Sequence, residues 1–211
     1  MSSAPSFSSE LPAVLIPHVD SVQKQLLLRY AELLRRINAS LNLISRKDIE
    51  WVWEHHIIPS LLFLGWWRLP AGAKVLDIGT GGGLPGIPLA ITHPQTYFFL
   101  IDSTRKKVEA LRFIVKELEL SERVEVHWGR AEELPTRFPY IVGRAVAPLP
   151  RFLSWCQKVL SPQGTVFYYT GGDYGPLPPP WKGEFYAFAQ LVPQDEYLSS
   201  KGILKAHLSP A

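Results

Sequence analysis

A turn rich in glycine, "DIGTGGGLPG" at residues 77–86, has residue types and spacing suited to binding a ligand. Four of the five residues from 79 to 83 are glycine, and they follow the short apolar run "KVLDI". Glycine adopts backbone conformations closed to other residues, and its missing side chain lets a ligand approach the main chain. A plain strand-to-helix connection is the alternative, but it needs fewer glycines. We therefore expect this turn to hold a ligand.

The aspartate that precedes this turn indicates which ligand it suits. The glycines from 81 to 86 match the G-x-G-x-x-G pattern of dinucleotide sites, which by itself is a weak signal. A carboxylate at Asp77 would disfavour a nearby pyrophosphate, but it could hold the cationic methionyl end of S-adenosylmethionine, directly or through water. Pro85 and Pro88 also make the first helical turn less regular than phosphate binding by amides requires. The pattern favours a positively charged nucleoside cofactor over a dinucleotide.

Residues at or just after the ends of two further apolar runs could bind adenosine. "FFLID" ends in Asp102, whose carboxylate could accept hydrogen bonds from both ribose hydroxyls. Its alternative role is to cap the next helix, with Ser103 as a competing cap. In "GRAEELP", Ala131 and Glu132 lie where backbone amides or a side chain could bind an adenine edge. A place for Glu132 in the first turn of a helix is the alternative.

The pattern of elements predicts how these residues come together. Apolar residues at three- and four-residue spacing predict an amphipathic helix over residues 20–37, and a second helix over residues 48–64 capped by Asp48 and kinked or interrupted at Pro59. From residue 74 onward, short apolar runs alternate with helical segments, which indicates an α/β fold with a parallel sheet covered on both faces. Ligands bind at the carboxyl ends of such strands. Residues 172–185 are predicted to form a proline-rich loop, and the last thirty residues one or two edge strands.

Composition bounds the class of protein. The chain has 211 residues, a net charge of +3 and an isoelectric point near 9.0, which permits an anionic partner without requiring one. Cys156 has no partner for a disulfide bond or a zinc site. Apolar stretches stay below the roughly 20 residues that span a bilayer, and the first residues do not look like a signal peptide. We expect a soluble, cytoplasmic protein.

Five segments together resemble a known family. They are "NLISRKDIEWVWEHHIIPSL", "VLDIGTGGGLPGIPLAI", "LIDSTRKKVEALRFIVKELEL", "GRAEEL" and "GRAVAPLPRFLSW". The chain resembles, over residues 20–171, the bacterial small-subunit (16S) ribosomal RNA guanine-N7 methyltransferase G family, also called glucose-inhibited division protein B. The resemblance implies a class I S-adenosylmethionine-dependent methyltransferase (Rossmann-like) fold. It would have an N-terminal helical extension at residues 1–70 and a methyltransferase domain at residues 71–211.

The resemblance also implies site residues. The family's cofactor contacts fall on Gly79, Leu84, Ala131, Glu132 and Arg144, with Asp102 as the ribose ligand; Asp77 and Gly81 join them from the reasoning above.

Three positions depart from the family's pattern. Pro59 in "HIIPS" stands where the family usually has an aspartate, Gly143 where it has a serine, and Thr170 in "YYTGG" where it has a lysine. The missing lysine could weaken RNA binding or mark a divergent member.

Methylation of guanine N7 would need little acid–base chemistry. N7 has an in-plane lone pair and no proton to lose, so alignment and charge placement replace a general base. Arg144 could align guanine, a phosphate or the cofactor carboxylate. His56 matches the family's histidine and is interpreted as an orienting or RNA-proximal residue, with core packing as the alternative. His55 and His56 are adjacent and point in different directions on a helix, so we expect no metal site.

The expected partner is small-subunit ribosomal RNA, either naked or within an assembling particle, with no membrane and no DNA. Basic residues and tryptophans could guide or stack the RNA, although solvated helix faces and core packing are the commoner uses of both. They are Arg29, Arg35, Arg36, Arg46, Lys47, Arg105, Lys106, Lys107, Trp51, Trp53, Trp66 and Trp67. The alternatives are a methyltransferase for another RNA or a small molecule, and a nucleotide-binding module without catalysis.

Overall fold

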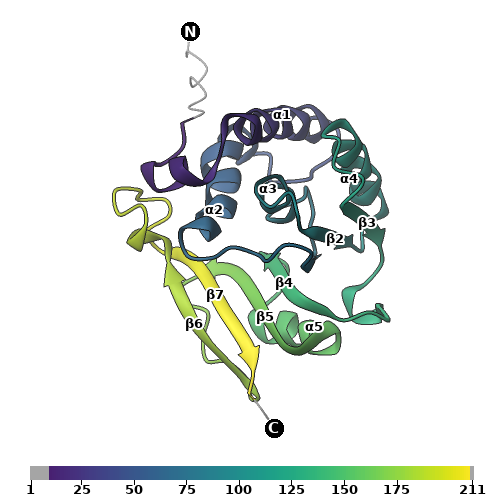
Figure 1. The fold of residues 1–211 in the computed structure, drawn as a ribbon, viewed down its shortest axis with the longest axis vertical. Helices are drawn as coiled ribbons and strands as arrows, with labels where there is room; N and C mark the ends of the chain where they lie inside the picture. Colours follow the sequence, from purple (N-terminus) through teal and green to yellow (C-terminus); the bar gives the residue numbers. More distant parts are fainter. Residues whose placement is uncertain (1–9, 210–211) are drawn as a thin grey trace.

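The sheet that organises the molecule has seven strands in the order β3-β2-β1-β4-β5-β7-β6 (Figure 1). The computed structural model describes residues 10–209. The strands are β1 (Lys74–Ile78), β2 (Tyr97–Asp102), β3 (Val124–Trp128), β4 (Phe138–Arg144), β5 (Leu160–Gly171), β6 (Trp181–Ala187) and β7 (Lys201–Leu208). The first five strands are parallel, whereas β7 is antiparallel to both β5 and β6. The predicted α/β class is confirmed.

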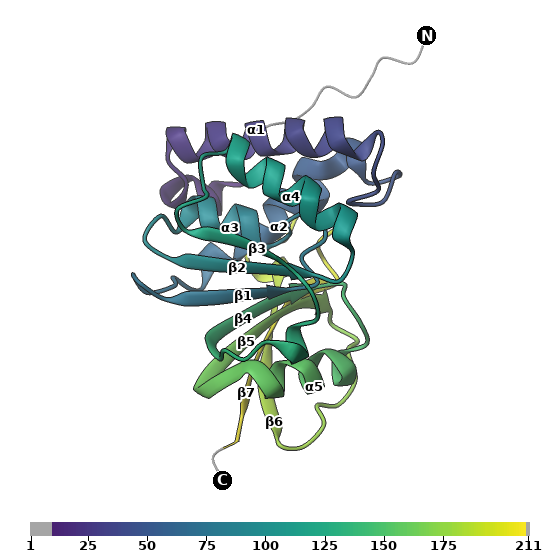
Figure 2. The ribbon, with the colours of Figure 1, turned by 90° about the vertical axis from the view of Figure 1, so that its right-hand side faces the viewer.

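Helices cover both faces of this sheet, but unequally (Figure 2). One face carries α1 (Ser21–Asn38), α2 (Ile58–Leu61), α3 (Gly86–Thr92) and α4 (Arg105–Glu117), and the other carries α5 (Leu149–Val159). Each face buries its own apolar cluster, and the larger cluster lies beneath the first four helices. The strand ends at Ile78, Asp102 and Arg144 lie at one edge of this sheet, as the parallel order requires.

The predicted amphipathic helix is confirmed as α1, shifted by one residue. Asp20 caps it: the Asp20 carboxylate accepts a hydrogen bond from the Gln23 amide at 2.8 Å, and the Gln23 side chain accepts one from the Asp20 amide. Leu27, Tyr30 and Leu34 on its inner face are fully buried, in the same cluster as residues of the sheet. The N-terminal helical segment and the sheet therefore share one core.

Residues 48–64, predicted as a helix kinked or interrupted at Pro59, form helical turns of changing type instead of one regular helix. This segment contains four short pieces: η2 (Ile49–Trp51), the π-helical turn η3 (Trp53–Ile57), α2 and η4 (Leu62–Gly65). Pro59 has no N–H to donate to the carbonyl oxygen of His55, so regular helical hydrogen bonding cannot run through it. Asp48 makes no capping hydrogen bond and instead lies 3.4 Å from the Nδ1 atom of His55.

The C-terminal region contains two strands, as predicted, but only β6 is an edge strand, because β7 inserts between β5 and β6. The predicted loop at residues 172–185 is shorter than expected, since β6 begins at Trp181. The remaining short helices are η1 (Ala13–His18), η5 (Ala131–Glu133) and η6 (Phe188–Gln190). Within residues 10–209, every helix is too short or too polar to cross a membrane.

Candidate functional site

The glycine turn joins β1 to α3 and uses its glycines for two distinct purposes. Gly79, Gly81 and Gly83 have φ angles of +67°, +56° and +99°, which side-chain-bearing residues rarely adopt. Gly86 is needed for close packing instead, since a Cβ atom there would lie 2.6 Å from the Oδ2 atom of Asp77. The turn therefore depends on glycine for its path and for its fit onto β1.

Asp77 supports this turn from below. Its Oδ2 atom accepts hydrogen bonds from the Thr80 hydroxyl at 2.7 Å and from the Gly86 amide at 2.9 Å. Burial raises the pKa of the Asp77 carboxyl from 3.8 to about 7, although both hydrogen bonds act to lower it. Its Oδ1 atom is buried and has no hydrogen-bond partner among the described residues. Its contact with the methionyl end of a cofactor stays a prediction, because Asp77 is fully buried beneath the turn.

Asp102 connects the glycine turn to the second strand. Its carboxylate accepts hydrogen bonds from the Gly81 amide at 3.0 Å and from the Thr104 amide at 2.8 Å. The N-cap of α4 is Thr104, so neither Asp102 nor Ser103 occupies the capping position. A carboxylate has about four lone-pair directions, and the two amides leave acceptor capacity free. Asp102 can therefore shape the turn and still accept from ribose hydroxyls.

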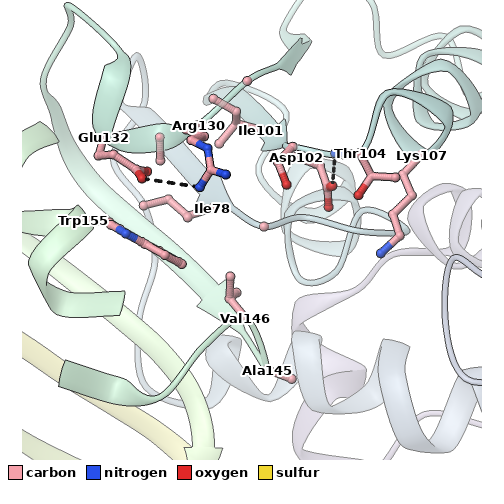
Figure 3. Close-up of a pocket in the computed structure, with 14 residues that line it drawn as sticks. Ile78, Ile101, Asp102, Thr104, Lys107, Arg130, Glu132, Ala145, Val146 and Trp155 are labelled. Carbon is pink, nitrogen blue, oxygen red and sulfur yellow. Dashed lines mark hydrogen bonds and ion pairs between the residues drawn. The ribbon is translucent and has the colours of Figure 1, made fainter. Parts of the chain in front are cut away.

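A cavity of about 290 Å³ lies over the carboxyl ends of β1, β2 and β4 (Figure 3). Four predicted cofactor residues line it: Gly79, Asp102, Ala131 and Glu132. Its other lining residues are Ile78, Ile101, Ser103, Thr104, Lys107, Gly129, Arg130, Ala145, Val146 and Trp155. Asp77, Gly81, Leu84 and Arg144 lie outside this lining. Figure 3 places Asp102 and Lys107 toward one end, and Glu132 and Trp155 toward the other.

Sequence reasoning missed several of these residues. Lys107 was interpreted only as a residue that could guide RNA, and Val146 and Trp155 were not singled out. Val146 follows β4 closely, so its place after a strand end was an available signal. Trp155 reaches the cavity from α5, and only the packing of that helix places it there.

A second cavity, also of about 290 Å³, adjoins the first at Ala145, which lines both. Its lining residues are Pro59, Arg144, Ala145, Tyr169, Thr170, Gly171, Phe188, Ser200, Lys201 and Gly202. Ala145 has a φ angle of +51°, a conformation that non-glycine residues adopt mainly at strained or functional positions. The two cavities therefore share a lining residue directly after the end of β4.

Arg144 borders the second cavity and is held by the irregular helical segment. Its guanidinium donates hydrogen bonds to the carbonyl oxygens of His55 at 2.7 Å and His56 at 3.3 Å. Pro59 cannot donate an N–H to the His55 carbonyl, so that acceptor is free for the arginine. The predicted alignment of the cofactor or substrate by Arg144 stays a prediction. Its observed contacts are with the backbone carbonyl oxygens of His55 and His56.

His56 lies beneath this region and lines neither cavity. Burial and, to a smaller extent, the neighbouring Arg144 lower the pKa of His56 from 6.5 to about 3. Its Nε2 atom is buried and has no hydrogen-bond partner within residues 10–209. The ring is neutral at pH 7, and this environment matches the core-packing alternative.

Two of the three departures from the family's pattern lie at the second cavity. Pro59 and Thr170 line it. At Gly143 a Cβ atom would lie 2.5 Å from the ring of Phe152, so that ring leaves no room for the serine usual in the family.

The N-terminal helix reaches the glycine turn directly. The Tyr30 hydroxyl of α1 donates a hydrogen bond to the carbonyl oxygen of Gly82 at 2.9 Å. Of the tryptophans considered for RNA stacking, Trp53 is buried and Trp51 is 45% exposed. Trp51 is therefore accessible to a base, and Trp66 and Trp67 are partly exposed.

Comparison with known proteins agrees with this geometry. The family model described as GidB, rRNA small subunit methyltransferase G, matches residues 23–174. A curated relative from Chlorobium limicola, ribosomal RNA small subunit methyltransferase G, is 45% identical over 72% of this chain and 69% of its own.

Solved structures show the fold. MtNAS in complex with S-adenosylmethionine has a TM-score of 0.60 at 16% identity, over 90% of this chain and 77% of its own. Precorrin-6y C5,15-methyltransferase from Geobacter metallireducens has a TM-score of 0.52 at 14% identity, over 81% of this chain and 92% of its own. The chain belongs to the rRNA small subunit methyltransferase G family.

Proposed function

We propose that this chain transfers the methyl group of S-adenosylmethionine to the N7 atom of a guanine in small-subunit ribosomal RNA. Family membership supports the S-adenosylmethionine-dependent methylation of small-subunit ribosomal RNA. The proposal goes further in three respects. It specifies guanine and its N7 atom, it places the reaction in the cytoplasm, and it allows either naked RNA or an assembling particle as the substrate.

The residues at the first cavity fit the cofactor. The Asp102 carboxylate keeps acceptor capacity for ribose hydroxyls after binding the amides of Gly81 and Thr104. Ala131 and Glu132 would hold the adenine edge, and the methionyl end would lie along Gly79. When bound, S-adenosylmethionine supplies an electrophilic methyl group on a sulfonium.

The lining of the second cavity supports guanine N7 as the atom that accepts the methyl group. Its described lining residues include no carboxylate, histidine or cysteine that could take up a proton. Tyr169 donates its hydroxyl to the Ser60 carbonyl at 3.0 Å, and burial raises its pKa well above 10. Guanine N7 fits such a cavity because its lone pair attacks the methyl carbon without losing a proton. The carbon–sulfur bond breaks as the carbon–nitrogen bond forms.

The test is to identify the modified nucleoside. The protein would be incubated with S-adenosylmethionine carrying a labelled methyl group, and with either naked small-subunit ribosomal RNA or small subunits from cells that lack the protein. The RNA would then be digested to nucleosides and separated by chromatography. We expect the label in 7-methylguanosine. Label in another nucleoside would overturn the choice of N7, and absence of label on both substrates would overturn the proposed function.

A further inference from the structure

Lys201 is the first residue of β7 and lies beyond the matched segment 23–174. It pairs with Gly171 at the end of β5, so the antiparallel strand brings it to the edge of the sheet where the parallel strands end. Its side chain lines the second cavity together with Arg144 and Thr170. Lys201, which is distant in the sequence from Arg144, thus lies beside the second cavity, where the proposed reaction would place the substrate base.

The Lys201 side chain is held in place by the segment that precedes β7. Its Nζ atom lies 3.4 Å from the centre of the Tyr197 ring and donates a hydrogen bond to the Tyr197 carbonyl oxygen. The Tyr197 ring stacks on His55 at 3.6 Å with an 8° angle between the planes, and Trp51 follows at 5.6 Å from His55. These rings form a platform that fixes the lysine beside the cavity mouth. An ammonium has three donors, so donors remain for a ligand.

Lys201 and Arg144 form an unneutralised pair of cations. In the described part of the chain, no carboxylate lies within 4.0 Å of either side chain. After desolvation, repulsion from Arg144 is the largest cause of the lowered pKa of Lys201, and attraction by Asp195 or Asp48 is weaker. Arg144 uses two of its five N–H donors for carbonyl oxygens, and Lys201 uses one of its three for the Tyr197 carbonyl oxygen, so both cations keep donors for a ligand. Two cations beside one cavity indicate an anionic ligand.

The chemistry of the proposed reaction decides which part of the substrate that anion is. Methyl transfer to guanine N7 moves the positive charge from sulfur to the base. An uncompensated cation beside the base would oppose this movement, whereas a cation bound to a phosphate is neutralised. Ammonium groups bind phosphates well as compact charges. The backbone of the RNA next to the target base is therefore the suitable ligand.

We propose that Lys201, supported by Tyr197 and His55, binds a backbone phosphate of the substrate RNA and so positions the target nucleotide at the second cavity. This inference rests on the proposed function for the identity of the RNA. It makes Lys201 a positioning residue that acts on RNA binding and not on the transfer step.

The experiment compares Lys201→Ala with Lys205→Ala, which removes the same charge from the same strand four residues away. Binding of small-subunit ribosomal RNA would be measured by filter retention over a range of salt concentrations, with thermal unfolding as the check on folding. Lys201→Ala should weaken binding about tenfold. It should also reduce the dependence of log affinity on log salt by about 0.7–0.9, the change expected for one lost phosphate contact. Lys205→Ala should keep the parental slope, and Lys201→Arg should restore most of the affinity.

Kinetics supply the second measurement. Lys201→Ala should raise the KM for RNA while kcat at saturating RNA and the affinity for S-adenosylmethionine stay at parental values. A parental salt slope in Lys201→Ala, or a fall in kcat with an unchanged KM, would overturn the proposal. If the unaltered protein binds RNA but methylates none, the proposed function fails, and the salt slope still decides the role of Lys201.

Discussion

At the scale of single residues, Asp102 combines two tasks that can be separated by substitution. Its carboxylate holds the Gly81 and Thr104 amides and lines the first cavity. In Asp102→Asn the side-chain nitrogen cannot accept from one of those amides, and the charge that would attract ribose hydroxyls is lost. Hydrogen bonds to charged groups are worth about 1.5–3 kcal/mol, so the Kd for S-adenosylmethionine should rise about ten- to a hundredfold.

Calorimetry with the folded variant checks this prediction. Asp173→Asn is the control, because Asp173 is exposed and does not line this cavity, and the same charge is removed. We expect a smaller change from it. Equal effects of the two substitutions would contradict the assigned role of Asp102.

Arg144 should affect stability as well as activity. Arg144→Ala removes the arginine donor from the carbonyl oxygen of His55, whereas the His56 carbonyl keeps the hydrogen bond from the Ser60 hydroxyl at 2.7 Å. An unmade hydrogen bond of this kind costs about 1–3 kcal/mol, and the free energy of unfolding should fall by that amount in chemical denaturation. Arg105→Ala, which removes an exposed pair with Glu109, should change it by less than about 0.5 kcal/mol. Parental stability of Arg144→Ala would show that these contacts are unimportant.

Asp77 should give the folded protein a characteristic pH dependence. Its pKa is raised from 3.8 to about 7 in the folded state, so the folded protein binds more protons than the unfolded chain between these values. The contribution of Asp77 to stability therefore falls as pH rises from about 4 to about 7. Asp77→Asn removes this contribution, and its stability relative to the parent should rise over the same range.

Denaturation at several pH values measures that difference. The pKa values of His56 and His93 are lowered by burial to about 3 and about 4, so both residues destabilise the fold as pH falls below 6.5. They are present in both proteins and cancel in the comparison. A stability difference that does not change with pH would refute the raised pKa of Asp77.

At the scale of elements, α1 supports the glycine turn through the hydrogen bond from the Tyr30 hydroxyl to the Gly82 carbonyl oxygen. Tyr30→Phe removes the hydroxyl that donates to the Gly82 carbonyl and leaves the packing of the ring intact. The free energy of unfolding should fall by about 1–3 kcal/mol because a buried acceptor is left unpaired. A looser turn should also raise the KM for S-adenosylmethionine.

Tyr97→Phe is the matched control for this change, since Tyr97 lies on β2 and is 48% exposed. Steady-state kinetics and chemical denaturation of the two variants provide the comparison. If Tyr30→Phe loses stability with an unchanged KM, α1 stabilises the fold without shaping the cofactor site.

At the scale of the whole molecule, the boundary near residue 70 does not separate two cores. Leu27 and Leu34 of α1 belong to the same buried cluster as Ile87 of α3 and Leu111 of α4. A chain of residues 71–211 alone would expose the outer faces of α3 and α4 to water. We expect it to lack the cooperative thermal transition of the full chain, as measured by circular dichroism. A cooperative transition in the shorter chain would favour an independent methyltransferase domain.

The sequence by itself determined the features that depend on local chemistry. The glycine turn, the strand that ends in Asp102 and the amphipathic helix over residues 20–37 are all readable because each follows from residue types within a short segment. Parallel strands then bring their carboxyl ends together, which is why Gly79, Asp102, Ala131 and Glu132 line one cavity, and their contact with the cofactor stays a prediction.

The tertiary structure alone decided the features that depend on distant segments. Pro59 was expected to kink a helix, but only the fold shows that the carbonyl released nearby is bound by Arg144, 89 residues away in the chain. Lys201 reaches the second cavity because β7 inserts between β5 and β6, a pairing set by the burial of apolar residues on both faces of the sheet. Such contacts have no local signature in the sequence. Their free energy comes from packing and desolvation between elements, whereas a sequence pattern describes each element separately.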